Sequence, residues 1–66
     1  MSVAKITEIT STSKDSFHDA IEKGLNRASD TLKNIEGAWV KDMKVSCKNG
    51  KVDEYRVNLK VTFVLH

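Results

Sequence analysis

The sequence contains no proline, one cysteine and four aromatic residues among its 66, and these shortages exclude several classes of protein. A single cysteine, Cys47, cannot form a disulfide within the chain, so the fold is not held by disulfides. No proline-rich linker or low-complexity segment divides the sequence, which predicts one domain over residues 1–66. No apolar run approaches the roughly 20 residues that cross a bilayer, and we expect neither a signal peptide nor a membrane partner. Together with the lone thiol, this favours the cytoplasm.

Neither sign of charge dominates the chain. Eleven Lys and Arg residues face nine Asp and Glu residues, for a formal net charge of +2. The two signs are interspersed along the chain, and no basic block is present. Nucleic acid is therefore not expected as a partner.

The most regular feature of the sequence is an alternating segment near its C-terminus. Between residues 51 and 65 one parity is apolar: Tyr55, Val57, Leu59, Val61, Phe63 and Leu65. The segment predicts a strand that runs roughly 45 Å at about 3.3 Å per residue, longer than a domain of this size covers. A chain this short buries only about 60% of its unfolded surface. Without disulfides or a metal cluster to support it, we expect it to associate with copies of itself.

The remaining pattern predicts an α+β domain with the order β-α-β-β. The first strand, over residues 3–10, alternates imperfectly, which predicts a bulge or an exposed apolar residue. A helix is predicted to begin at Lys14, with Ser13 as its N-cap, and to end near Lys33-Asn34. Apolar residues recur along it at the spacing of one face that covers a sheet. They are Phe17, Ala20, Ile21, Leu25, Ala28 and Leu32.

Gly24 lies on this apolar face, where glycine costs about 1 kcal/mol relative to alanine. Two explanations stay open: close approach of another backbone, or simple tolerance of glycine.

The second strand changes parity. Ala38 and Val40 share one parity, whereas Met43, Val45 and Cys47 share the other, so we predict a bulge near Lys41-Asp42.

Residues 48–51 predict a hairpin turn. A loop of three residues, with Gly50 in the left-handed conformation, would pair Val45 with Asp53 and Met43 with Tyr55. Because a helical crossover makes the first two strands parallel, the third strand is predicted to lie between them. The expected sheet is antiparallel with order 1-3-2 and packs on one helix.

No second helix remains to cover the other face of this sheet. That face is expected to carry Arg56, Asn58, Lys60, Thr62 and, with the bulge in place, Trp39. Such a face either packs against copies of itself or holds a flat ligand between copies. Trp39 is then an interface residue or a stacking platform, and Arg56 is a solvated strand residue or a donor to phosphate or carbonyl oxygens.

Four stretches together resemble the dodecin family over nearly the full chain. They are the N-terminal segment Val-x-Lys-Ile-x-Glu-Ile-x-x-x-Ser, the helix segment Ala20-Ile21-x-x-Gly24-Leu25-x-Arg27-Ala28, the dipeptide Thr31-Leu32, and the C-terminal segment Glu54-Tyr55-Arg56-Val57-x-Leu59-x-Val61-x-Phe63-x-Leu65. The resemblance implies a hollow homododecamer of cubic symmetry. It also implies that flavins bind in pairs between tryptophans of twofold-related subunits, for storage or sequestration and not for catalysis.

The expected cofactor is accordingly a flavin: FMN, riboflavin or FAD. Aligned from Thr31-Leu32, the family's stacking tryptophan falls at Gly37, and Trp39 lies two positions later on the same face, about 6.6 Å away. The family's flavin-contacting glutamine falls at Arg56, which can donate to a flavin carbonyl or a phosphate. The cofactor-binding residues predicted in this way are Trp39, Arg56, Gly37 and Asn58.

The alternative is a dodecin-like structural oligomer that does not bind flavin in the standard mode. It would hold ions or another nucleotide at its symmetry axes. The carboxylates available for such ions, if repeated around an axis, are Asp42, Asp53 and Glu54, although solvated turn charges are their commoner explanation.

Other reactive side chains do not form a site within one subunit. His18 and Glu22, four apart on the helix, are too few to hold a metal. Cys47 has no evident partner that would activate its thiol. We therefore predict no catalytic residue, no metal site and no enzymatic activity.

Overall fold

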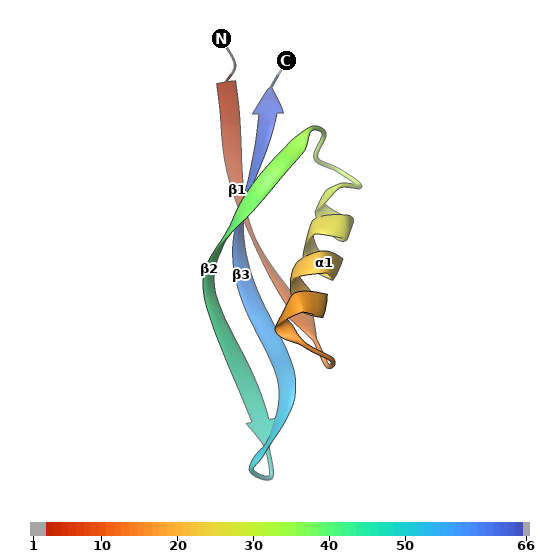
Figure 1. The fold of residues 1–66 in the computed structure, drawn as a ribbon, viewed down its shortest axis with the longest axis vertical. Coiled ribbons are helices and arrows are strands. Elements are labelled where there is room, and N and C mark those ends of the chain that lie inside the picture. Colours follow the sequence, from red (N-terminus) through yellow and green to blue (C-terminus); the bar gives the residue numbers. More distant parts are fainter. Residues whose placement is uncertain (1–2, 66) are drawn as a thin grey trace.

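A computed structural model describes residues 3–65 as a three-stranded antiparallel sheet with one helix (Figure 1). The elements follow in the order β1 (Val3–Ser13), α1 (Phe17–Ala28), β2 (Ile35–Lys48) and β3 (Lys51–Leu65). The strands are ordered β1-β3-β2, so the predicted fold class and sheet order are confirmed. The molecule is long and narrow, 51 × 19 × 14 Å, and the β2–β3 turn extends beyond the helix. Within residues 3–65, no helix is both long enough and apolar enough to cross a membrane.

The core lies between α1 and the middle of β3. Val57, Leu59 and Val61 are completely buried, as their alternation predicts. From the helix, Ala20, Gly24 and Ala28 are buried against the sheet at a spacing of four residues. The larger members of the predicted apolar face pack around this cluster: Phe17, Ile21, Leu25 and Leu32. Small residues in the centre of the face let the helix lie close to the strands.

β1 pairs with β3 without any register shift, from Val3 opposite Leu65 to Ser13 opposite Tyr55. Of the two explanations for its imperfect alternation, the exposed apolar residue is correct, because Ile6 is 60% exposed. The strand runs three residues beyond the predicted end, since β3 also supplies partners for residues 11–13.

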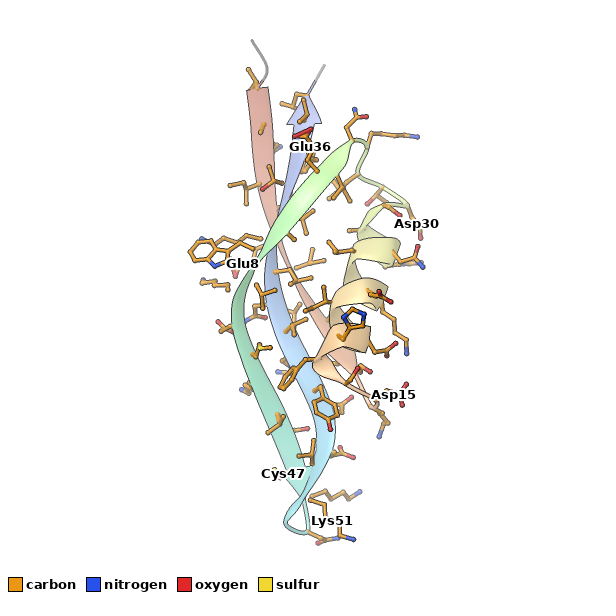
Figure 2. All side chains as sticks on the ribbon, in the orientation of Figure 1. Glu8, Asp15, Asp30, Glu36, Cys47 and Lys51 are labelled. Atoms are coloured by element: carbon orange, nitrogen blue, oxygen red, sulfur yellow. The ribbon has the colours of Figure 1, made fainter. Side chains whose placement is uncertain are left out.

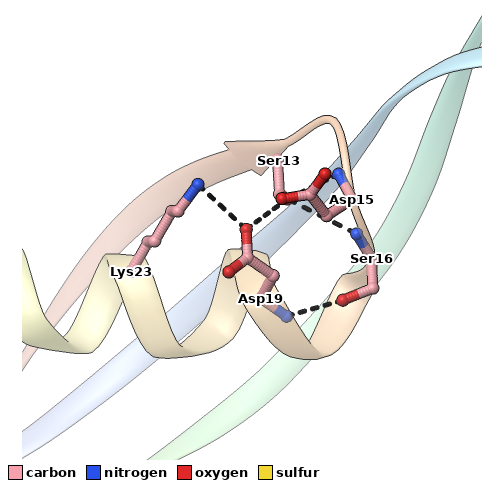
Figure 3. Close-up of polar contacts among 5 residues, drawn as sticks. All are labelled: Ser13, Asp15, Ser16, Asp19 and Lys23. Carbon is pink, nitrogen blue, oxygen red and sulfur yellow. Dashed lines mark hydrogen bonds and ion pairs between the residues drawn. The ribbon is translucent and has the colours of Figure 1, made fainter.

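The helix begins later than predicted, because Ser16 and not Ser13 is its N-cap. The Ser16 hydroxyl accepts a hydrogen bond from the N–H of Asp19 at 2.9 Å. Ser13 is the last residue of β1, and its buried hydroxyl accepts from the N–H groups of Asp15 at 2.9 Å and Ser16 at 3.4 Å (Figure 3). Ser13 therefore closes the turn that precedes the helix, and the predicted start at Lys14 is wrong.

The helix also ends earlier than predicted, at Ala28 and not near Lys33-Asn34. The N–H of Leu32 still bonds to the carbonyl of Ala28 at 2.9 Å, so the apolar face continues through a turn. Asn34 then adopts a positive φ of 61°, which asparagine tolerates better than most residues. This conformation directs the chain into β2.

Neither of the two explanations left open for Gly24 is correct as stated, because close packing requires the glycine but its neighbours are side-chain atoms and not another backbone. A Cβ atom at this position would lie 2.9 Å from Ser11 Cβ and 3.4 Å from Leu59 Cδ1. Side chains of β1 and β3 therefore set the distance between helix and sheet.

The predicted bulge in β2 is confirmed. Val40 pairs with Leu59 and Asp42 pairs with Asn58, so Lys41 is an extra residue in the strand. Its insertion brings the apolar residues on both sides of it onto the face that α1 covers.

The predicted three-residue hairpin loop is wrong. Lys48 pairs with Lys51, and the two central residues Asn49 and Gly50 have positive φ angles of 54° and 76°. This is the type I′ turn that Asn-Gly favours, and only the left-handed Gly50 is as expected. The extra residue is Asp53, at a register shift between Ser46 and Cys47. Val45 consequently pairs with Tyr55, and Met43 pairs with Val57.

Candidate functional site

The candidate site lies on the sheet face opposite α1, which we call the open face (Figure 1). Cross-strand pairing arranges this face in rows of three residues, one each from β1, β3 and β2. Four consecutive rows are Ile6–Thr62–Gly37, Glu8–Lys60–Trp39, Thr10–Asn58–Asp42 and Thr12–Arg56–Lys44. The bulge at Lys41 places Trp39 on this face, as predicted.

Trp39 is 63% exposed, although it is the largest apolar side chain in the sequence. The ammonium of Lys60, directly across on β3, lies 5.2 Å from the centroid of the Trp39 ring. Glu8, which is labelled in Figure 2, belongs to the same row. Its carboxylate forms an ion pair with the ammonium of Lys41, 3.5 Å away. The row and the neighbouring bulge residue Lys41 thus combine an exposed indole, two cations and one carboxylate.

The next row is joined by hydrogen bonds across all three strands. Thr10 donates its hydroxyl to the Asn58 amide oxygen at 2.8 Å, and the Asn58 amide nitrogen donates to Asp42 at 2.8 Å. These contacts fix the orientation of the Asn58 side chain. One of its two amide hydrogens is left for a further acceptor.

The four residues predicted to bind a cofactor occupy four consecutive rows. Gly37 precedes Trp39 by one row, and a Cβ atom there would meet nothing within 4 Å, so the surface beside the indole is bare. Asn58 follows Trp39 by one row and Arg56 follows by two, about 13 Å from Lys60 along β3. Gly37, Trp39 and Asn58 are therefore adjacent, while Arg56 is more distant within one chain.

Sequence analysis placed Lys60 on the open face but missed its contact with Trp39. The contact follows from the register between β2 and β3, in which Trp39 lies directly opposite Lys60. The bulge at Lys41 supplies the signal for the face, but the register also depends on the shift at Asp53, which local patterns do not locate. The sequence alone therefore does not identify the pair.

A hollow of about 460 Å³ lies elsewhere, between α1 and β1. Its lining includes Ile9, Ser11, Lys23, Gly24 and Arg27. These residues belong to the helix and to the edge of the sheet, so the hollow does not adjoin the Trp39 ring. A ligand stacked on Trp39 would need further walls from outside the chain.

The other reactive side chains remain dispersed. His18 and Glu22 form an exposed pair, 3.0 Å apart, and Cys47 is a free, exposed thiol. Among residues 3–65, no group of three or more His, Cys, Asp or Glu side chains is arranged to hold a metal ion. Asp42 is hydrogen-bonded to Asn58, and Asp53 lies 3.5 Å from Lys14.

Comparisons with known proteins agree on one family. The family model described as Dodecin matches residues 3–66. The chain is 32% identical to the dodecin from Streptomyces davaonensis, with a TM-score of 0.94 over 98% of this chain and 96% of that one. It is 33% identical to a tryptophan-to-phenylalanine variant of Thermus thermophilus dodecin, with a TM-score of 0.94 over 100% and 98%.

A further similar structure is the calcium dodecin of Mycobacterium tuberculosis, a calcium chelating immunodominant antigen. It is 31% identical, with a TM-score of 0.83 over 97% of this chain and 91% of that one. No curated protein matches the sequence. Because the family model spans nearly the whole chain and the solved dodecins share its fold, the chain belongs to the dodecin family.

Proposed function

We propose that this chain is a non-enzymatic flavin-binding protein that stores or sequesters FMN, riboflavin or FAD in the cytoplasm. In this proposal twelve copies assemble into a hollow shell, and the flavins bind where copies meet. Membership in the dodecin family supports the class of function. The observation that carries the proposal is the exposure of Trp39, at 63%, on a sheet face without a helix.

An exposed indole is a suitable platform for a planar ring, because offset stacking of aromatic systems adds to the burial of apolar area. Lys60 lies over the Trp39 ring at 5.2 Å, yet most of the side chain stays accessible. The bare surface at Gly37 leaves room beside it. A second copy approaching the open face would supply the opposite wall.

Two polar residues would orient the ligand. Arg56 is exposed and would donate to a flavin carbonyl or a phosphate, either in its own subunit or across the junction. Asn58 would donate its remaining amide hydrogen, with its orientation held by Thr10 and Asp42. Neither residue supplies an acid or base to a reaction, which agrees with storage and not with catalysis.

The test is titration of the purified protein with FMN and riboflavin, followed by flavin fluorescence and by native mass. Stacking on tryptophan should quench the flavin, and the assembly should have the mass of twelve chains. Trp39→Ala should abolish the quenching and leave the mass unchanged. Trp39→Phe, which keeps an aromatic ring, should retain part of the affinity.

The structural oligomer that holds ions is the second candidate, favoured by the similarity to a calcium dodecin. Because no metal cluster is found in the described part of one chain, such a site would combine carboxylates from several copies. In this case Trp39→Ala should weaken assembly and flavin should not be quenched. Calcium should then raise the melting temperature of the assembled protein.

A further inference from the structure

The ammonium of Lys60 is a charged feature of the open face that flavin stacking alone does not use. It lies over the Trp39 ring, 5.2 Å from the centroid. The ion pairs formed within residues 3–65 do not include Lys60. An ammonium in this position adds positive charge beside the candidate stacking surface.

The nearby carboxylates are already engaged with other partners. Glu8, the acidic residue of the same row, lies 3.5 Å from the ammonium of Lys41. Asp42, in the next row, accepts a hydrogen bond from Asn58 at 2.8 Å. Neither carboxylate forms an ion pair with Lys60, so its ammonium is available to an anion from outside the chain.

We propose that Lys60 makes the Trp39 site selective for a planar ligand that carries a phosphate, so that FMN binds more tightly than riboflavin. This inference rests on the proposed function. FMN and riboflavin have the same ring system, so stacking on Trp39 contributes equally to both. They differ in the terminal phosphate, and an ammonium interacts with this difference.

Lys60 is suited to this role by its flexibility and by its present contact. Its ammonium is a compact charge with three donors on a four-carbon stem, so it can turn from the indole toward a ligand. A cation over an exposed ring is weakly held, whereas a hydrogen bond between two charged groups is stronger. Moving from the ring to a phosphate is therefore favourable, and a neutral ligand offers no such gain.

The test compares FMN and riboflavin affinities for four proteins, each first shown to have the native mass of the assembled form. They are the wild type, Lys60→Met, Lys60→Arg and Lys48→Met. Lys60→Met removes the charge with little change in length, and Lys60→Arg keeps the charge. Lys48→Met is the matched control, because it removes the same charge at the hairpin turn, far from Trp39. All four proteins keep Arg56.

The wild type should bind FMN about fivefold more tightly than riboflavin at low salt. Lys60→Met should reduce this difference in affinity to whatever part Arg56 contributes, while Lys60→Arg and Lys48→Met should keep the full difference. Raising the salt concentration from about 0.05 M to about 0.5 M should weaken FMN binding in the wild type and leave riboflavin binding nearly unchanged.

Two results would overturn the inference while leaving the proposed function intact. One is equal affinity of the wild type for FMN and riboflavin, and the other is an FMN preference that Lys60→Met leaves undiminished. If the wild type quenches neither flavin, the proposed function itself fails, and the role of Lys60 fails with it. The riboflavin titration distinguishes these cases, because riboflavin tests ring binding without the phosphate.

Discussion

Ser13 Oγ donates a hydrogen bond of 2.5 Å to Asp19 Oδ2, and this contact ties the end of β1 to the first turn of α1 (Figure 3). The ammonium of Lys23 lies 3.0 Å from the same carboxylate oxygen. The hydrogen bond from Ser13, and then that from Lys23, lower the pKa of Asp19 from its ordinary value. The same carboxylate raises the pKa of Lys23. The ionised form of Asp19 is thus favoured by folding.

Ser13→Ala should destabilise the fold by about 1 kcal/mol at neutral pH, because the turn loses the acceptor of two backbone N–H groups. It should also move the pKa of Asp19 back toward its ordinary value. A lowered pKa contributes stability above the unfolded-state pKa, and this contribution is lost as the pH falls through the folded-state pKa. The difference in the free energy of unfolding between the wild type and Ser13→Ala should therefore become smaller below about pH 4.

Urea unfolding at several pH values, with an NMR titration of the Asp19 carboxyl, measures both effects. Ser29→Ala is the control, because it removes a serine hydroxyl from the other end of α1, where it donates to the carbonyl of Asn26. It should leave the Asp19 titration unchanged. An unaltered Asp19 pKa in Ser13→Ala would contradict the assignment of its cause.

Gly24→Ala should lower the stability, although alanine is the better helix former by about 1 kcal/mol. The added Cβ would lie 2.9 Å from Ser11 Cβ, and the resulting overpacking typically costs about 1–3 kcal/mol. Thermal unfolding measures the net effect. The double variant Ser11→Gly/Gly24→Ala removes the facing atom and should recover part of the loss. A melting temperature that rises in Gly24→Ala would show that the helix is not held at this distance.

Moving the indole by two residues tests whether the bare surface at Gly37 and Trp39 belong to one binding site. Trp39→Ala should abolish flavin quenching, and adding Gly37→Trp should restore it, because both positions lie on the open face of β2. The chain has room for the new side chain, since no atom lies within 4 Å of a Cβ at residue 37. Flavin titration measures the recovery.

Gly37→Leu in the same Trp39→Ala background is the matched control for this exchange. It fills the surface without an aromatic ring and should not restore quenching. Equal recovery with leucine would mean that bulk, and not stacking, determines binding at this position.

Much of the fold could be predicted from short sequence patterns. The alternation around Leu59 identified the central strand and its buried face, and the parity change between Val40 and Met43 located the bulge. These predictions succeeded because a parity error would place apolar residues in water and charged residues in the core.

The boundaries of the helix and the length of the hairpin loop were harder to predict. Ser13 and Ser16 can both act as an N-cap, and the choice depends on pairing of Ser13 with Tyr55, a residue distant in the sequence. The hairpin has a similar ambiguity, because an extra residue in the loop or one at Asp53 produces the same parity. Local patterns do not distinguish these alternatives.

The candidate site was only partly predictable for a related reason. The exposed position of Trp39 follows from the bulge in its own strand, whereas the contact with Lys60 depends on the register between two strands. Lys60 has the sequence pattern of any solvated strand residue. Only the three-dimensional arrangement distinguishes it from Lys44, two rows away.

The central strand of the sheet is also the last of the three to be synthesised. β1 and β2 are not neighbours in the sheet, and each finds its partner only in β3. At about 5–20 residues per second, the ribosome adds the 15 residues of β3 in roughly one to three seconds. During translation the first two strands must therefore remain without their native hydrogen bonds, and the sheet forms only after β3 has been synthesised.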